Sequence, residues 1–266
     1  MATVIGIINQ EPGSGKTALA VNTAAALALC EKKTLLVDSD PAGTATGRMI
    51  GREYPPARGL DRIFLDGQLS VEVFYRPVHE ALVDYLEIIP AGPDLSGVEA
   101  VLADTPGREE ILRDVLQTLS GEVELVVIDA PPSLDFHTTA VITAADLLVI
   151  PVACRAESIA PLHRLLAQVQ QIRRQRNPGL KIAGVVFTHC PDREAVAATI
   201  PADVLAGLQP VLADFTIAGE TEDTGGEDAP VIVRDVLSAA AEPFLDLAAL
   251  LIEKSNTGQT KGGQAK

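Results

Sequence analysis

The sequence is poor in the residues that would build a disulfide framework, a base-stacking surface or a membrane span. Its three cysteines, Cys30, Cys154 and Cys190, lie far apart without C-x-x-C spacing, which favours reduced, packed thiols over disulfides or a zinc site. Aromatic residues make up 3% of the chain, too few for a surface that stacks bases. No run approaches the ~18 apolar residues of a membrane span, and no basic segment with a cleavage site opens the chain. These absences predict a cytoplasmic protein.

The charge and length of the chain narrow the prediction further. A formal net charge of −15 argues against a surface that attracts nucleic acid everywhere, although a local basic patch is compatible with it. With 266 residues and 47% hydrophobic content, the chain can bury one sizeable core. We predict a single domain over residues 1–254 and a polar, Gly-rich disordered tail over residues 255–266. The histidines are interpreted as packed or solvated side chains, because they form no close constellation: His79, His137, His163 and His189.

Short β-branched runs alternate with longer helical patterns, which is the signature of β-α-β units. Several of these runs are apolar throughout, as expected of strands covered on both faces. The predicted fold class is α/β, with a doubly wound, mostly parallel sheet and helices on both faces. The expected strands are Thr3–Asn9, Thr34–Asp38, Tyr85–Pro90, Val123–Asp129, Asp146–Val152, Lys181–Thr188 and Val211–Ile217. The expected helices are Lys16–Cys30, Leu95–Ser120 with an interruption near Pro106, His137–Ala145, Ser158–Arg176, Glu194–Leu208 and Val233–Lys254, and residues 41–80 and 218–231 are expected to be loops.

A glycine-rich loop, NQEPGSGKT at residues 9–17, follows the first buried strand and precedes an alanine-rich helix. In this context a Gly-Lys-Thr triplet predicts a phosphate site, the alternative being a glycine-rich turn without a ligand. Gly13 and Gly15 let backbone N–H groups turn toward phosphate oxygens, and the helix N-terminus adds partial positive charge. Lys16 can reach the β- and γ-phosphates, and Thr17 can place its hydroxyl on Mg²⁺. The predicted nucleotide-binding residues of this P-loop NTPase are Gly13, Ser14, Gly15, Lys16, Thr17 and Ala18.

Carboxylates follow two other strands where those strands end. The segment LLVDSDPAGTAT at residues 35–46 supplies Asp38 and Asp40, and VELVVIDAPPSLD at residues 123–135 supplies Asp129. Ligands bind at the carboxyl edge of open α/β sheets, so these side chains are expected near the phosphate loop. A carboxylate at Asp129 can hold Mg²⁺ through water. For the segment with Asp38 alone, a turn in which Asp and Pro cap a strand is a fair alternative.

The three segments, in this order, resemble the ParA/MinD family of partitioning ATPases, whose phosphate loop departs from the ordinary pattern. The resemblance continues through DLLVIPV and the next helix, and covers about residues 2–190. It implies that Lys16 and Asp40 are catalytic, with Asp40 orienting the attacking water. It also implies that Thr17, Asp38 and Asp129 lie at the metal.

The same resemblance implies cofactors and partners. The cofactors are ATP and Mg²⁺, with ATP favoured over GTP because the strand after Lys181 ends in THCPD and no Asn-Lys-x-Asp motif follows it. Hydrolysis is expected to be weak and stimulated by a partner. The expected partners are a second copy of the chain, in an ATP-dependent homodimer, and a cargo adaptor protein.

The loop departs from the family at Glu11, where the family has a lysine that crosses the dimer interface to the partner's phosphates. Two like charges ~4 Å apart repel by roughly 4 kcal/mol at an effective dielectric near 20, so Glu11 must turn away from the triphosphate or be neutralised. Pro12 also removes one N–H donor from the loop. This departure indicates a branch without the signature lysine, like the ATPases that space carboxysomes.

Arg155 is the predicted replacement for the missing cation. It lies in PVACRAES, at the carboxyl end of the strand expected beside the nucleotide strands. The planar fork of arginine can bind two phosphate oxygens, and its charge could also offset Glu11. The alternative is that Arg155 forms an ion pair with Glu157 or another surface carboxylate.

A basic cluster follows the Leu- and Gln-rich helix. The segment QQIRRQRNPGLK contributes Arg173, Arg174, Arg176 and Lys181 to an otherwise acidic chain. Because members of the family bind DNA without sequence preference, this cluster is a predicted DNA contact, which would place the protein at the nucleoid. The alternative is a solvated helix end whose cations complement the helix dipole. The C-terminal helix predicts no membrane binding, because its polar face carries acids where membrane-binding helices carry bases: Asp235, Glu242, Asp246 and Glu253.

Three functions remain open on the sequence. The first is an ATPase that positions or partitions a plasmid, a chromosome or a protein organelle. The second is an ATP-binding scaffold or sensor that does not hydrolyse. The third is an ATP-dependent ligase or reductase, which is the weakest, because an iron–sulfur reductase would need paired cysteines where this chain has APPSLD, and no substrate site for a ligase is evident.

Overall fold

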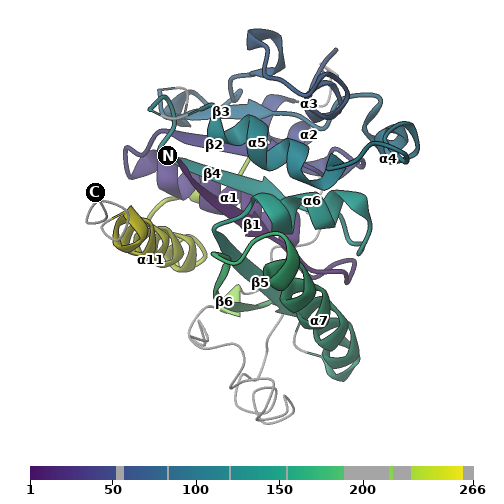
Figure 1. The fold of residues 1–266 in the computed structure, drawn as a ribbon. Helices are drawn as coiled ribbons and strands as arrows, with labels where there is room; N and C mark the ends of the chain where they lie inside the picture. The colour runs from purple at the N-terminus through teal and green to yellow at the C-terminus, as the bar shows by residue number, and fades with distance from the viewer. Residues whose placement is uncertain are drawn as a thin grey trace.

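The computed structural model describes residues 1–51, 57–82, 84–119, 121–153, 155–188, 216–217 and 229–259. At its centre is a seven-stranded sheet in the order β3-β2-β4-β1-β5-β6-β7, and each neighbouring pair of strands is parallel (Figure 1). The predicted α/β class with a mostly parallel sheet is confirmed. The strands are β1 Thr3–Ile7, β2 Thr34–Asp38, β3 Leu86–Ile89, β4 Leu125–Asp129, β5 Leu147–Ala153, β6 Lys181–Thr188 and β7 Thr216–Ile217.

Helices cover both faces of this sheet. One hydrophobic core joins one face to α3, α5, α6 and α7, and a second core joins the other face to α1, α2 and α11 (Figure 1). Strands β2, β4 and β5 are buried along their whole length, as expected of parallel strands between two helical layers. The helices are α1 Lys16–Leu29, α2 Thr44–Ile50, α3 Leu60–Asp66, α4 Val98–Val101, α5 Ile111–Gln117, α6 Phe136–Ala144, α7 Ile159–Gln175, α10 Val231–Arg234 and α11 Glu242–Gln259.

A glycine in the central strand lets α6 approach the sheet closely. A Cβ atom on Gly6 would lie 3.0 Å from Leu148 Cδ2 and 3.0 Å from Val141 Cγ1, which is tighter than most real contacts. Any larger residue at position 6 would push α6 outward. Since α6 begins directly after the segment that follows β4, this packing also sets where that segment lies.

The segment 41–80 was predicted to be a loop, and this prediction is wrong in part. Residues 44–50 form α2 and residues 60–66 form α3, because Met49 and Phe64 are buried in the two cores. Tertiary packing here outweighs a local composition rich in Gly, Pro and Arg. Composition alone could not reveal these helices, because seven residues are too few to show a helical periodicity of apolar positions.

Two long predicted helices are interrupted in the structure. The first, predicted over Leu95–Ser120 with an interruption near Pro106, has that interruption, because it forms α4 and α5 with 3-10 turns at Leu95–Gly97 and Arg108–Glu110. The C-terminal helix is divided into α10 and α11 by a turn in which Ser238 Oγ donates to the Asp235 carbonyl at 2.7 Å. Helix α11 begins at Glu242, so Pro243 lies in the first turn, where proline is tolerated, and not in the interior of a longer helix. Helix α11 continues to Gln259, past the predicted end of the domain at Lys254.

Several predictions fall outside the described residues: the helix Glu194–Leu208, most of the strand Val211–Ile217, and Cys154, His189 and Cys190. Among the helices that the structure does describe, none is both long and apolar enough to cross a membrane.

Candidate functional site

The carboxyl ends of β1, β2, β4 and β5 meet at one edge of the sheet. Strand β1 pairs with β4 on one side and β5 on the other, and β2 pairs with β4. In that last pair Asp38 lies opposite Asp129. The structure therefore brings the glycine-rich loop after β1 together with the predicted carboxylates, at the edge where open α/β sheets bind ligands.

The glycine-rich loop has the backbone geometry that a phosphate site needs. Gly13 and Gly15 adopt positive φ angles of 70° and 85°, which residues with a Cβ atom rarely adopt. No side chain of the described residues caps the N-terminus of α1 at Gly15, so the first N–H groups of this helix can bind an anion. The loop is tied to β6, because Thr188 Oγ1 donates to the carbonyl of the buried Ser14 at 3.0 Å.

Lys16 is a buried cation folded back over this loop. Its side chain is 6% exposed, and Nζ donates to the Glu11 carbonyl at 3.1 Å and lies 3.5 Å from Ser14 Oγ. Burial lowers the pKa of Lys16, and the charges of Asp129, Asp40 and Glu11 oppose this change. Among the described residues, the Lys16 ammonium group is bonded to neutral acceptors, and an anionic ligand would form stronger hydrogen bonds with it.

Asp129 is the best-supported metal ligand. It is fully buried, and neither carboxylate oxygen has a hydrogen-bond partner among the described residues. Burial raises the pKa of Asp129 well above its usual range, the Asp38 charge raises it further, and the nearby Thr17 hydroxyl lowers it. Unpaired buried carboxylates are costly unless a cation or a donor completes them. The site therefore fits a divalent cation.

The ligand set also fits magnesium in particular. In the part of the chain that the structure describes, no three His, Cys, Asp or Glu side chains form a ready metal cage. Mg²⁺ does not need one, because it is commonly held by one or two protein oxygens together with water and substrate phosphates. Thr17, half-buried at the start of α1, and Asp129 are the side chains placed to supply those oxygens.

Asp38 has a different environment from Asp129, because both of its oxygens accept hydrogen bonds. Oδ1 accepts from the Asp40 N–H at 3.1 Å, and Oδ2 accepts from the N–H and the hydroxyl of Thr46 at 2.8 and 2.7 Å. Burial raises the pKa of Asp38 to about 6, against the lowering effect of these bonds. Asp38 therefore shapes the turn that leads to α2. The sequence analysis missed Thr46, whose only signal is a threonine in the first turn of an unrecognised helix.

Asp40 stands on that turn, half-buried at the site. Its Oδ1 accepts from the Ala42 N–H at 2.9 Å, and its carbonyl accepts from the Gly43 N–H at 2.9 Å. Its charge reaches Lys16 and Asp129, where it raises the pKa of both groups. The turn thus holds a carboxylate close to the loop and to the metal ligand without burying it.

Glu11 and Arg155 form an ion pair at the same edge. Arg155 Nε donates to Glu11 Oε1 at 2.9 Å, with the arginine side chain 50% exposed and the glutamate side chain 13% exposed. A Cβ atom on Gly13 would lie 3.9 Å from Arg155 Nη2, so the guanidinium group also lies against the loop. Arg155 therefore forms an ion pair with a carboxylate, as the alternative for this residue expected, but that carboxylate is Glu11 in place of Glu157, so the guanidinium charge lies next to the Glu11 charge.

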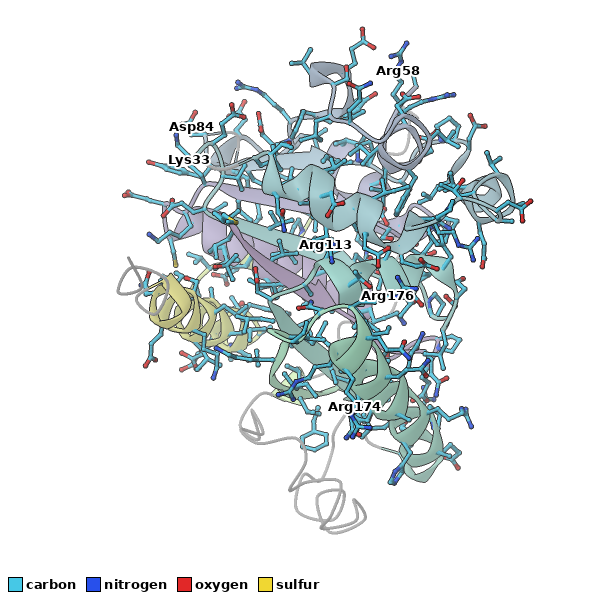
Figure 2. All side chains as sticks on the ribbon, in the orientation of Figure 1. Lys33, Arg58, Asp84, Arg113, Arg174 and Arg176 are labelled. Carbon is cyan, nitrogen blue, oxygen red and sulfur yellow. The ribbon has the colours of Figure 1, made fainter. Side chains whose placement is uncertain are left out.

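The predicted basic cluster is divided by the structure. Arg173 and Arg174 are exposed in the last turn of α7, and Lys181 is exposed at the start of β6. Arg176 is instead bound by Glu110 Oε1 and by Glu109 Oε2, the latter at 3.5 Å. Figure 2 shows Arg176 near Arg113 and Arg174 well apart from both. Arg176 is therefore removed from the group of freely exposed cations.

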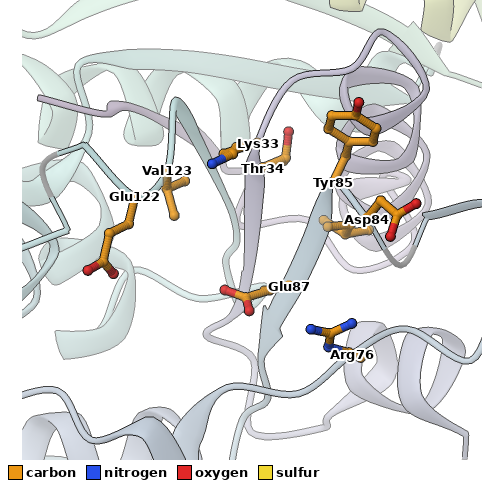
Figure 3. A pocket seen from close by; sticks show the side chains of 9 residues that line it. Lys33, Thr34, Arg76, Asp84, Tyr85, Glu87, Glu122 and Val123 are labelled. Carbon is orange, nitrogen blue, oxygen red and sulfur yellow. The ribbon is translucent and has the colours of Figure 1, made fainter.

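A shallow trough of about 240 Å³ lies at the opposite edge of the sheet, at the amino ends of β2 and β3. Figure 3 shows that mixed charges line it, among them Lys33, Arg76 and Glu87. These three side chains are exposed, and the buried polar residue of the lining, Thr34, donates its hydroxyl to the Lys32 carbonyl at 2.8 Å. The lining of the trough therefore differs from the carboxyl edge, where buried charged side chains face the site.

The chain is similar to known proteins along nearly its whole length. A family described as an AAA domain matches residues 2–182. The chromosome partitioning protein ParA of Caulobacter vibrioides (strain NA1000 / CB15N) is 33% identical over 267 residues, which cover 97% of this chain and 97% of that protein.

Two solved structures share the fold over a similar length. One is cobyrinic acid a,c-diamide synthase from Mycobacterium smegmatis with a bound ATP analogue and magnesium, with a TM-score of 0.80, 25% identity and 97% of each chain covered. The other is the Cyanothece McdA(D38A)–ATP complex, with a TM-score of 0.80 and 22% identity over 94% of this chain and 96% of that one. The second likeness concerns the fold alone.

Proposed function

Because the chain belongs to the ParA/MinD family of ATPases, we propose that it binds and hydrolyses ATP with Mg²⁺ at the carboxyl edge of its sheet. The observation that carries this proposal is the buried, unpaired carboxylate of Asp129 beside a loop that offers Lys16 and an uncapped helix N-terminus. The ATP analogue and magnesium in the similar M. smegmatis structure support it.

Each residue has a defined task in this proposal. The backbone N–H groups of residues 13–18 and the Lys16 ammonium bind the phosphates. Thr17 and Asp129 hold Mg²⁺, which neutralises phosphate charge when bound. Asp38 contributes negative charge near the metal without binding it directly, because both of its oxygens accept hydrogen bonds from Thr46 and from the backbone of the turn. Asp40, on that turn, orients the attacking water.

We further propose that two copies enclose two ATP molecules in a dimer, as the deviant loop of the family implies. Arg155 supplies the cation that the family takes from a lysine at position 11. Its position against Gly13, with half of its side chain exposed, supports this role. The fork of arginine suits a phosphate that arrives from the partner subunit.

The dimer is proposed to bind DNA without sequence preference and to position a cargo through an adaptor protein. Arg173, Arg174 and Lys181 are the exposed cations proposed for DNA, and Arg176 orders the end of α7. The partitioning relative from C. vibrioides supports a chromosome or a plasmid as cargo. The alternative cargo is a protein organelle, and this proposal is supported by the absence of the signature lysine from the loop. In a cell, such a protein would reside in the cytoplasm at the nucleoid.

Turnover tests this function against a non-hydrolysing scaffold, which would share every binding residue. Phosphate release from wild type and Asp40→Ala should be measured with Mg²⁺-ATP, alone and with duplex DNA and a candidate adaptor. We expect slow turnover that a partner stimulates, and its loss in Asp40→Ala with ATP binding retained. No turnover under any stimulus would favour the scaffold. A ligase on this fold is supported only by the likeness to the M. smegmatis synthase at 25% identity, and hydrolysis without an acyl substrate would argue against it.

A further inference from the structure

The backbone of Glu11 is fixed on both sides of its side chain. Its N–H donates to Asn9 Oδ1 at 2.9 Å, and its carbonyl accepts from Lys16 Nζ at 3.1 Å. The side chain that leaves this point is largely buried, at 13% exposure. Glu11 therefore presents its carboxylate from a constrained position within the loop, and is not a freely rotating surface acid.

The backbone of Arg155 is fixed in a similar way. Its N–H donates to the Ala153 carbonyl at 2.8 Å, and its own carbonyl accepts from the Ser158 N–H at 3.1 Å. The guanidinium group gives one of its five N–H donors, the one on Nε, to Glu11. Within the described part of the chain, no hydrogen bond of Nη1 or Nη2 is found, so the four remaining donors form a half-exposed fork beside Gly13.

Stability does not explain this ion pair. Pairs with a half-exposed partner contribute little to folding, because water screens the attraction and holding long side chains costs entropy. Here the pair also leaves Glu11 Oε2 buried and without a hydrogen-bond partner among the residues that the structure describes, which is unfavourable. A contact that adds little to stability, beside a nucleotide loop, calls for a functional explanation.

We propose that Glu11 is a positioning residue that holds Arg155 by Nε, so that Nη1 and Nη2 are directed at the phosphates of the ATP bound by the partner subunit. The inference rests on the proposed nucleotide-sandwich dimer. A carboxylate at position 11 then has the opposite effect from the one its charge suggests. Its repulsion of phosphate is offset by Arg155, and its hydrogen bond orders an arginine that would otherwise sample many rotamers.

Two interpretations of Glu11 make opposite predictions. If Glu11 is only a repulsive charge that Arg155 neutralises, Glu11→Ala removes the repulsion and the dimer becomes tighter. If Glu11 positions Arg155, Glu11→Ala frees the guanidinium and the dimer becomes weaker. One such change weakens each of two equivalent contacts in a symmetric dimer, so the dissociation constant should rise on the order of tenfold to a hundredfold.

The test is light scattering over a range of protein concentrations, with Mg²⁺ and a slowly hydrolysed ATP analogue. Affinity for the analogue is measured separately at concentrations where every variant is monomeric. We expect Glu11→Ala and Arg155→Ala to dimerise more weakly than wild type, with monomer affinity for the analogue within about twofold of wild type, since the phosphate-binding backbone and Lys16 are unchanged. Arg164→Ala, which removes an exposed arginine of α7, is the matched control and should dimerise like wild type.

A double variant adds a second, independent comparison. Glu11→Lys combined with Arg155→Glu exchanges the two charges and puts the cation on the loop itself, so it should dimerise better than Glu11→Ala. If Glu11→Ala dimerises as well as wild type, or better, Glu11 does not position Arg155, although the proposed dimer stands. A wild type that stays monomeric on the analogue would overturn the dimer, and this inference with it.

Discussion

Thr46 connects the loop that carries Asp40 to the core, and replacing it with valine should loosen that loop. Its hydroxyl donates to Asp38 Oδ2 at 2.7 Å and accepts from the Ala91 N–H at 3.1 Å. Valine has nearly the same shape, so Thr46→Val creates no cavity but removes both hydrogen bonds. A bond to a charged group contributes ~1.5–3 kcal/mol, and a buried N–H without an acceptor costs ~1–3 kcal/mol. We expect a loss of about 3 kcal/mol from the free energy of unfolding.

Urea unfolding without nucleotide, followed by circular dichroism, measures this loss. Thr46→Ser is the control, because it keeps the hydroxyl and removes only a methyl group, and its loss should be smaller, at ~1 kcal/mol. ATP turnover of Thr46→Val should fall more than its ATP affinity, because the turn positions Asp40 and not the phosphate loop. A Thr46→Val protein within ~0.5 kcal/mol of wild type would refute the argument that Asp38 is anchored through this hydroxyl.

Two other predictions concern α7 and the packing of α6. Arg173→Ala combined with Arg174→Ala should weaken DNA binding by the ATP-loaded protein in low salt and reduce its salt dependence, whereas Arg176→Ala should mainly lower thermal stability. Fluorescence anisotropy with labelled duplex DNA compares the two variants, and an equal loss of DNA affinity in both would contradict the division of the cluster. Burial lowers the pKa of His137 below its ordinary 6.5, so the unfolded chain binds a proton that the folded chain does not. The stability that neutral His137 contributes is therefore present above pH 6.5 and is lost as the pH falls below it. His137→Phe should reduce this acid sensitivity when unfolding is compared at pH 5 and pH 7.5, and an unchanged sensitivity would show that other groups cause it.

The sheet and the grouping of the site were predictable because both depend on local patterns. Apolar runs separated by helical periodicity define parallel strands, and the carboxyl ends of such strands must share an edge, so Lys16, Asp40 and Asp129 could be grouped from their order alone. Contacts between distant segments were harder to predict. The role of Thr46 depends on α2, which forms through tertiary packing. The partner of Arg176 at Glu110 lies 66 residues earlier in the chain. The position of Arg155 near the loop of Glu11 was predictable, because β5 and β1 are neighbours in the sheet and the segments that follow them lie at the same edge.

The most direct measurement is a titration of a slowly hydrolysed, labelled ATP analogue into wild type and Lys16→Ala, with and without Mg²⁺. Lys32→Ala is the matched control, because Lys32 pairs with Glu124 at the opposite edge of the sheet. The account predicts that Lys16→Ala loses affinity on the order of a hundredfold, that removing Mg²⁺ weakens binding to the wild type, and that Lys32→Ala binds normally. Undiminished affinity in Lys16→Ala would contradict the assignment of this loop as the nucleotide site.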